Sequence, residues 1–129
     1  MNWLKRHWFD IVLAIAIIIG TVYGFRSGGP AVESVPDVYV IRLDGEVEYA
    51  LYDFISAGID EAERRKAEAV LIEIATFGGR VDAMTDIGEA ITTAKVPVYT
   101  FVRGKALSAG AYIALSGKKI FMTPEAVMG

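Results

Sequence analysis

The stretch VYTFVRGKALSAGAYIALSG, residues 98–117, joins a β-branched and aromatic run to an apolar run rich in alanine. Residues 98–102 are typical of a buried strand, and residues 105–117 are typical of a helix that Gly117 ends. One small polar residue, Ser108, stands near the beginning of the expected helix. A strand that leads directly into a helix favours an α/β fold, and it raises the question of what the serine hydroxyl does.

The same alternation of short apolar runs and amphipathic runs continues on both sides of this stretch. Strands that alternate with helices pair in parallel, and we expect the strand residues to be buried on both faces of the sheet. The sequence therefore predicts an α/β domain with a mostly parallel sheet. The expected strands are residues 38–43, 69–75, 98–102 and 119–123, and the expected helices are residues 48–67, 82–95 and 105–117.

The N-terminal part of the chain has a different composition. Basic residues precede an uncharged run, residues 11–25, that is hydrophobic on every face and has nothing in the remaining chain to pack against. We expect residues 1–26 to be either an uncleaved signal anchor or a cleavable signal peptide. Because the basic residues precede the uncharged run, we expect the chain that follows this run to lie outside the cytoplasm. Residues 27–36 are then a linker, and residues 37–129 are the globular domain.

Composition excludes several classes of function. With a net charge of -3, the chain has no stripe of Lys and Arg with interleaved aromatic residues, so nucleic-acid binding is not expected. The absence of cysteine excludes disulfides, a thiol nucleophile and thiolate zinc sites. No pattern indicates a metal ion or a cofactor, and we expect neither.

Two loops after expected strands carry the residues that could take part in binding or catalysis. Loops at the carboxyl ends of parallel strands build binding sites. Gly78 and Gly79 follow one strand, and adjacent glycines let backbone N–H groups converge on one acceptor, as in an oxyanion hole. A tight turn would also explain them. Ser108 follows the next strand, where the helix dipole and the N–H of Ala109 would favour negative charge. Serine is also a common N-cap, so the residues alone leave both interpretations open.

A nucleophilic serine needs a general base. The single histidine, His7, lies before the membrane segment, which excludes a Ser-His-Asp triad on the domain side. A desolvated lysine is the alternative. Lys105 is three residues from Ser108, but a loop lysine is expected to stay solvated and charged. The residues themselves therefore indicate no convincing base.

Four stretches together resemble the ClpP-class membrane serine proteases of the NfeD family, the partner proteins of stomatin operons. The resemblance covers nearly all of residues 38–129. It implies a ClpP/crotonase-like fold of repeated ββα and βαβ units with a mostly parallel sheet, preceded by one N-terminal hydrophobic helix. The stretches are LDGEV (43–47), EIATFGGRVDAMTDIGEAI (73–91), KVPVYTFVRGKALSAGAYIAL (95–115) and KKIFMTPEAVMG (118–129).

The resemblance also implies an activity, that of a membrane-associated serine endopeptidase with a Ser-Lys dyad. Its substrate would be a protein or peptide, with a stomatin-like membrane protein as the expected partner, and the family resemblance implies self-association into a homo-oligomer. The residue roles that it implies are Ser108 as nucleophile, Gly78, Gly79 and the Ala109 N–H as the oxyanion hole, and Gly79, Arg80 and Val81 as the segment that pairs with extended substrate.

This sequence departs from the family pattern at two points. Thr76 and Phe77 stand where many relatives have a proline before the glycines. The family's base lysine follows the serine by a few tens of residues, which is beyond Gly129. We therefore expect residues 37–129 to be the first part of a longer protease domain with little activity alone.

Three alternatives remain at this point. A signal-peptide-peptidase-like enzyme shares the paired glycines and the serine helix, and the position of its lysine would distinguish it. A non-catalytic membrane scaffold or partner-binding module would not need Ser108 to react. A crotonase-like acyl-CoA enzyme fits the repeated units but gives Ser108 no role, and the hydrophobic leader argues against it.

Overall fold

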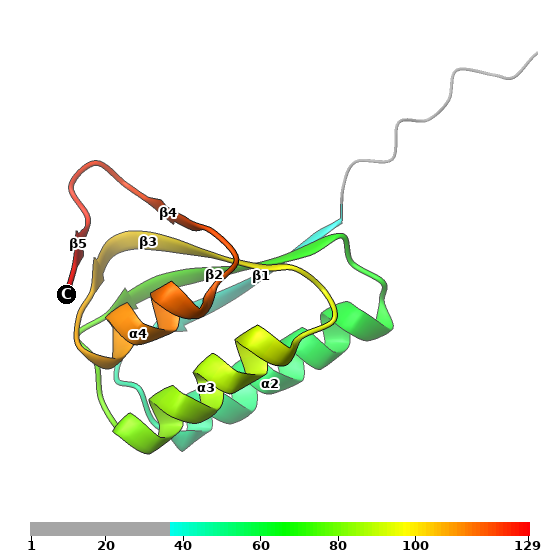
Figure 1. Ribbon diagram of the computed structural model, residues 1–129, viewed down its shortest axis with the longest axis horizontal. Coiled ribbons are helices and arrows are strands. Elements are labelled where there is room, and N and C mark those ends of the chain that lie inside the picture. Colours follow the sequence, from blue (N-terminus) through cyan, green and yellow to red (C-terminus); the bar gives the residue numbers. More distant parts are fainter. Residues whose placement is uncertain (1–36) are drawn as a thin grey trace, which may run out of the picture. The chain divides into compact units, whose positions relative to one another are not determined.

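The computed structural model describes residues 37–129 as alternating strands and helices (Figure 1). The expected membrane segment, residues 1–26, and the linker, residues 27–36, lie outside the described residues. Within residues 37–129, no helix is both long enough and apolar enough to cross a membrane. The elements are β1 (Val38–Asp44), α2 (Tyr49–Arg64), β2 (Ala69–Thr76), α3 (Val81–Thr93), β3 (Val98–Ala106), α4 (Ala109–Ser116), β4 (Ile120–Met122) and β5 (Val127–Met128).

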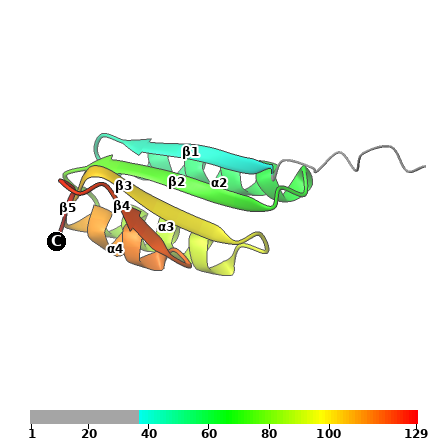
Figure 2. The same cartoon turned by 90° about the horizontal axis from the view of Figure 1, so that it is seen from above.

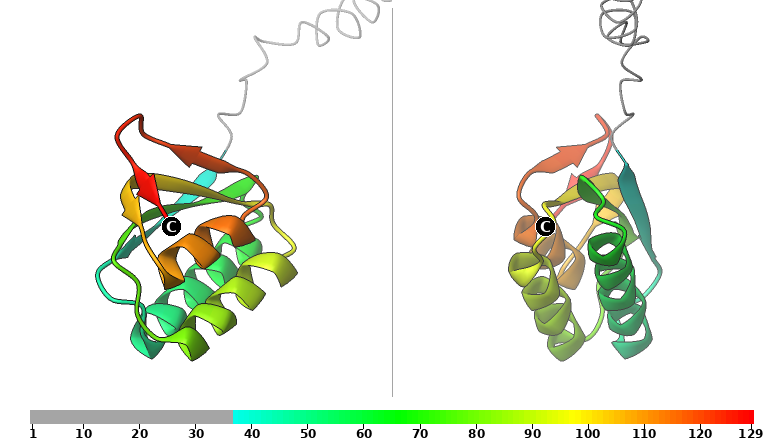
Figure 3. Two further views of the ribbon diagram at one scale, coloured as in Figure 1. Left: turned by 60° about the vertical axis from the view of Figure 1, so that its left-hand side comes forward. Right: turned by 90° about the vertical axis from the view of Figure 1, so that its right-hand side faces the viewer.

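The strands form one parallel sheet in the order β1-β2-β3-β4, with β5 added to the end of β3. Every strand pairing among the described residues is parallel. The three helices lie on one face of this sheet (Figure 2), and α2 and α3 run side by side there (Figure 3). The predicted α/β domain with a mostly parallel sheet is confirmed.

The sheet is buried on one face only, and the prediction of burial on both faces is wrong for the described part of the chain. Along β2, the residues that face the helices are buried and the alternate residues are only partly buried. The physical reason is the strand order. Each crossover leads to the next neighbour in the same direction, and right-handed connections in one direction place all their helices on the same face.

The core forms where the helices meet this face. Ile55, Ile59 and Ala62 of α2 and Ile87 and Ile91 of α3 are buried against the strands. Each fully buried isoleucine contributes about 1.5–3 kcal/mol relative to an exposed one. This packing holds the carboxyl ends of β1, β2 and β3 at a fixed edge, where the loops of interest leave the sheet.

Strand β3 is longer than predicted, and the expected helix start at residue 105 is wrong. Lys105 and Ala106 still belong to the strand, and α4 begins at Ala109. Their backbone groups have partners in β5, where Val127 and Met128 pair with them. These hydrogen bonds outweigh the helix preference of lysine and alanine, which amounts to less than about 1 kcal/mol per residue. Ser108 is therefore located in a sharp turn between a strand and a helix.

Candidate active site

Ser108 has an unusual backbone conformation. Its φ is 51° and its ψ is -117°, a region in which non-glycine residues are held at a cost of about 1–3 kcal/mol. The residue occupies the N-cap position of α4, but its side chain makes no capping hydrogen bond, and it is exposed. The N-cap interpretation therefore does not explain the hydroxyl. A strained, exposed serine at a strand-helix turn is an arrangement found at functional sites.

Gly78 lies directly against this serine. A Cβ at residue 78 would lie 2.9 Å from the Ser108 Cβ, 2.9 Å from the Leu107 carbonyl oxygen and 3.3 Å from the Ala109 nitrogen. Its φ of 111° also favours glycine. The structure thus brings together the two loops that the sequence singled out, and close approach between their backbones requires glycine at this position.

Gly79 is held from the opposite side by the loop after β1. The Val47 N–H donates to the Gly78 carbonyl at 2.9 Å, and the Arg80 N–H donates to the Val47 carbonyl at 2.8 Å. A Cβ at residue 79 would overlap the Val47 carbonyl oxygen. These contacts attach the glycine loop to the end of β1, and they explain why the second glycine is needed as well.

The N–H groups near Ser108 are not equally available. The Gly78 N–H donates to Oγ1 of Thr76 at 3.0 Å, so it is used within the loop. Within residues 37–129, the N–H groups of Gly79 and Ala109 have no hydrogen-bond acceptor. Two of the three N–H groups expected at an oxyanion hole are therefore free to bind a ligand.

The segment after the glycines has one free backbone edge. Arg80 is extended, with φ of -67° and ψ of 132°, and its N–H is taken by Val47. In an extended chain, successive residues direct their N–H groups to opposite sides, so the groups of Gly79 and Val81 face away from Val47. Val81 is 70% exposed. Pairing of this edge with an extended peptide stays a prediction.

The guanidinium of Arg80 is already engaged. It donates to both carboxylate oxygens of Asp82, with Nη2–Oδ2 at 2.6 Å and Nε–Oδ1 at 3.0 Å, and it lies 5.1 Å from the centroid of the Tyr49 ring. The Ala83 N–H also donates to Asp82. The hydrogen bonds from Arg80 and from Ala83 lower the pKa of Asp82 to about 2, and the pKa of Arg80 is raised in turn. The charge of Arg80 is therefore neutralised locally, and its backbone N–H and carbonyl are already hydrogen bonded to Val47 and Met84.

The Asp82 carboxylate should make the stability of the domain sensitive to acid. Its pKa is lowered from 3.8 to about 2, so its charge stabilises the fold above about pH 4, and this contribution is lost as the pH falls through about 2. We expect Asp82→Asn to lower the Tm near neutral pH and to have no effect at about pH 1, below both pKa values. Thermal scans over this range measure the difference. In an Arg80→Gln background, the effect of Asp82→Asn on the Tm should be smaller. An effect on the Tm that does not change with pH would contradict the lowered pKa of Asp82.

Lys105, the lysine nearest to Ser108 in sequence, contacts an aromatic ring. Its Nζ lies 3.4 Å from the centroid of the Phe77 ring, and Phe77 is 73% exposed. A charged ammonium is the form that a ring face attracts. Within residues 37–129, no lysine is hydrogen bonded to the Ser108 hydroxyl, and His7 lies outside these residues. The identity of the general base therefore stays a prediction from the family resemblance.

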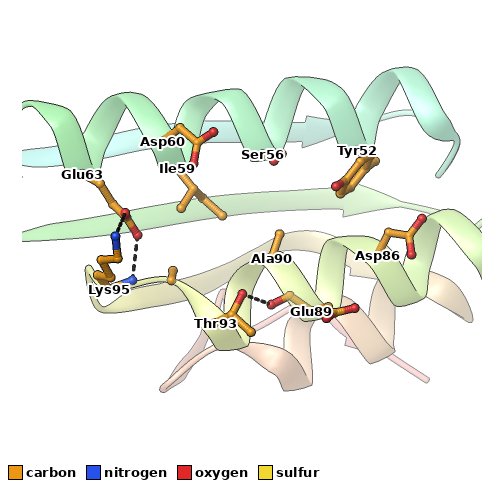
Figure 4. A pocket seen from close by; sticks show the side chains of 11 residues that line it. Tyr52, Ser56, Ile59, Asp60, Glu63, Asp86, Glu89, Ala90, Thr93 and Lys95 are labelled. Atoms are coloured by element: carbon orange, nitrogen blue, oxygen red, sulfur yellow. Dashed lines mark hydrogen bonds and ion pairs between the residues drawn. The ribbon is translucent and has the colours of Figure 1, made fainter.

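Two hollows differ in their relation to this site. The first, of about 370 Å³, lies between α2 and α3 and is lined by acidic side chains and Lys95 (Figure 4). There the Lys95 Nζ lies 3.9 Å from Oε2 of Glu63, so the charges are partly paired. The second, of about 430 Å³, is lined by Gly45, Glu46, Phe77, Gly78 and Gly79. Of these two hollows, the second includes Gly78, which packs against the serine turn, and it is the better candidate for binding a substrate. Within residues 37–129, no group of acidic or histidine side chains is arranged to hold a metal ion.

Comparison with known proteins places this geometry in a family. The chain is 40% identical over 92 residues to the membrane protein NfeD1b of Bacillus subtilis (strain 168), which covers 71% of this chain and 21% of that protein. It is 41% identical over 95 residues to the membrane-bound protease PH1510 of Pyrococcus horikoshii, covering 71% of this chain and 22% of the relative. The chain thus spans about a fifth of the length of these relatives.

Solved structures show the same fold. The 1510-N membrane-bound stomatin-specific protease, as a lysine-to-alanine variant in complex with a substrate peptide, superposes with a TM-score of 0.68 at 38% identity, covering 74% of this chain and 45% of that chain. A serine-to-alanine variant of the same protease superposes with a TM-score of 0.67. ClpP1 from Listeria monocytogenes gives 0.66 at 26% identity, covering 68% of this chain and 53% of that chain.

These likenesses agree with the family whose model matches the described residues. The model described as NfeD1b, N-terminal domain, matches residues 37–129, and the ClpP-like neighbours share the parallel sheet seen here. The resemblance stated from the sequence motifs is confirmed. The chain belongs to the NfeD1b N-terminal domain family.

Proposed function

We propose that this chain carries the nucleophile and the oxyanion hole of a membrane-associated serine endopeptidase. The observation that supports the proposal most is the strained, exposed Ser108 packed against Gly78, with the N–H groups of Gly79 and Ala109 free beside it. In this proposal the Ser108 hydroxyl attacks the scissile carbonyl. The two N–H groups then stabilise the charge that develops on its oxygen.

The general base in this proposal is a lysine outside residues 37–129. Two facts support it. Lys105 is held on the Phe77 ring, and a relative was solved as a lysine-to-alanine variant with a substrate peptide bound. A Ser-Lys dyad needs the lysine neutral when it accepts the serine proton, which a desolvated site achieves by lowering the pKa of the lysine.

The substrate is proposed to be an extended apolar segment of a stomatin-like membrane protein. A relative is described as stomatin-specific, and the free edge at Gly79 and Val81 supports binding of an extended strand. Residues 1–26 are proposed to hold the domain at the membrane, on its non-cytoplasmic side. Self-association of the protein stays a prediction from the family resemblance.

An active-site-directed fluorophosphonate tests the proposed function. We expect the probe to label the full-length protein at Ser108, as mapped by mass spectrometry, because among the serines of residues 37–129 only this one combines exposure with neighbouring N–H groups that have no acceptor. Ser116→Ala should label normally, since the Ser116 hydroxyl donates to the Tyr112 carbonyl at 3.0 Å, within α4. Absence of labelling at Ser108, or equal labelling of other serines, would favour the non-catalytic scaffold.

A further inference from the structure

Thr76, the last residue of β2, is a buried polar residue beneath the glycine loop. Its exposed fraction is 1%, and Thr76 and Thr100 are the two buried polar side chains among the described residues. The Thr76 hydroxyl donates to the Gly45 carbonyl and accepts the Gly78 N–H at 3.0 Å. Because a hydroxyl has a single proton, the bond to Gly45 orients its lone pairs toward Gly78.

These bonds determine where the next N–H points. The Gly78 N–H is held by Thr76, and the Gly78 carbonyl is held by the Val47 N–H at 2.9 Å. In a planar trans peptide, the carbonyl and the following N–H point in opposite directions. The N–H of Gly79 is therefore directed away from Val47. By accepting the Gly78 N–H, Thr76 helps to fix the orientation of Gly78, and this orientation determines the direction of the Gly79 N–H.

Thr76 also contacts the loop and helix that carry the serine. Its carbonyl accepts the Leu107 N–H at 3.1 Å, one residue before Ser108. A Cβ at Gly110, in the first turn of α4, would overlap the Thr76 methyl group, so the helix packs closely on this side chain. The hydroxyl thus orients the glycine loop, the carbonyl holds the loop that leads to Ser108, and the methyl group fills the space beside Gly110.

We propose that Thr76 is the positioning residue of the oxyanion hole, which sets the Gly79 N–H relative to the Ser108 hydroxyl through its bond to Gly78. This inference rests on the proposed function and extends it. Thr76 does not touch the substrate in this arrangement. Its loss should therefore impair the chemical step and leave peptide binding unchanged.

The test compares isosteric variants in the full-length protein. Thr76→Val removes the hydroxyl at constant shape, and we expect kcat for a peptide substrate to fall about 10-fold or more with KM within about twofold. Thr76→Ser keeps the hydroxyl and should restore most of kcat. Thr100→Val is the matched control, since Thr100 is 0% exposed and its Oγ1 donates to the Ala114 carbonyl at 2.8 Å, away from the serine turn. It should lower stability and leave kcat unchanged.

A second measurement does not depend on activity. Amide hydrogen exchange at Gly78 should be about 10-fold faster in Thr76→Val than in the wild type, and unchanged in Thr100→Val, because only the first loses its acceptor. Unchanged Gly78 exchange in Thr76→Val would overturn the inference whether or not the protein is active. Equal losses of kcat in both valine variants, or no rescue by serine, would also overturn it. An unlabelled wild-type Ser108 would instead overturn the proposed function, while the exchange measurement still decides the role of Thr76.

Discussion

Replacing Ser108 with alanine is expected to lower peptide hydrolysis by the full-length protein about 10³-fold or more. The variant removes the attacking oxygen and leaves the N–H groups of Gly79 and Ala109 in place, so only residual stabilisation by the oxyanion hole remains. Turnover of an apolar peptide, measured at saturating concentration, gives the loss. Ser116→Ala, on the same helix, should stay within about twofold of the wild type.

The Ser108→Gly variant distinguishes the effect of backbone strain from the loss of the hydroxyl. Both Ser108→Ala and Ser108→Gly remove the nucleophile, but only glycine tolerates a φ of 51° with a ψ of -117°. We expect Ser108→Gly to raise the free energy of unfolding by about 1 kcal/mol relative to Ser108→Ala, after the entropic cost of glycine is subtracted. Thermal unfolding of the two inactive variants measures this difference. Equal stability would show that the turn stores no strain, and full activity in either variant would refute the nucleophile.

The order of elements was predictable because each expected strand and helix had a clear pattern of apolar residues. Residues 38–43 and 69–75 coincide with β1 and β2 within one residue. The end of β3 was not predictable in this way. Lys105 and Ala106 have no strand preference of their own, and they become strand residues because both pair with β5 and Ala106 also pairs with Thr76 of β2. Val127 and Met128 form too short a run for a pattern to reveal.

In the candidate site, too, some features could be predicted from the sequence and others could not. Paired glycines and a serine after successive strands are local features, so the sequence could indicate which loops would meet at one edge of the sheet. The strain at Ser108 and the use of the Gly78 N–H by Thr76 depend on tertiary contacts. Thr76 offered one signal, a polar residue that continues the alternating series of apolar residues Val70, Ile72 and Ile74. The roles of Arg80 and Val81 in substrate binding stay predictions.

Replacing Gly79 with alanine is expected to be the most destabilising single change in the glycine loop. The new Cβ would overlap the Val47 carbonyl oxygen and lie 2.6 Å from the Val47 nitrogen. These are backbone atoms, and they can move only if the Val47–Gly78 and Arg80–Val47 hydrogen bonds break. We expect a loss of about 3 kcal/mol or more, equivalent to a fall in Tm of about 10 °C or more for a domain of this size.

Gly104→Ala provides the matched control for this loss. Gly104 also has a positive φ, 145° against 157° at Gly79, but a Cβ there would meet no heavy atom within 4 Å. Both variants therefore place alanine at an unfavourable φ, and only Gly79→Ala adds a collision with Val47. We expect Gly104→Ala to cost about 1–2 kcal/mol. If thermal unfolding showed equal losses, the glycine requirement at residue 79 would come from φ alone, and close contact with the β1 loop would not be what holds the Gly79 N–H in position.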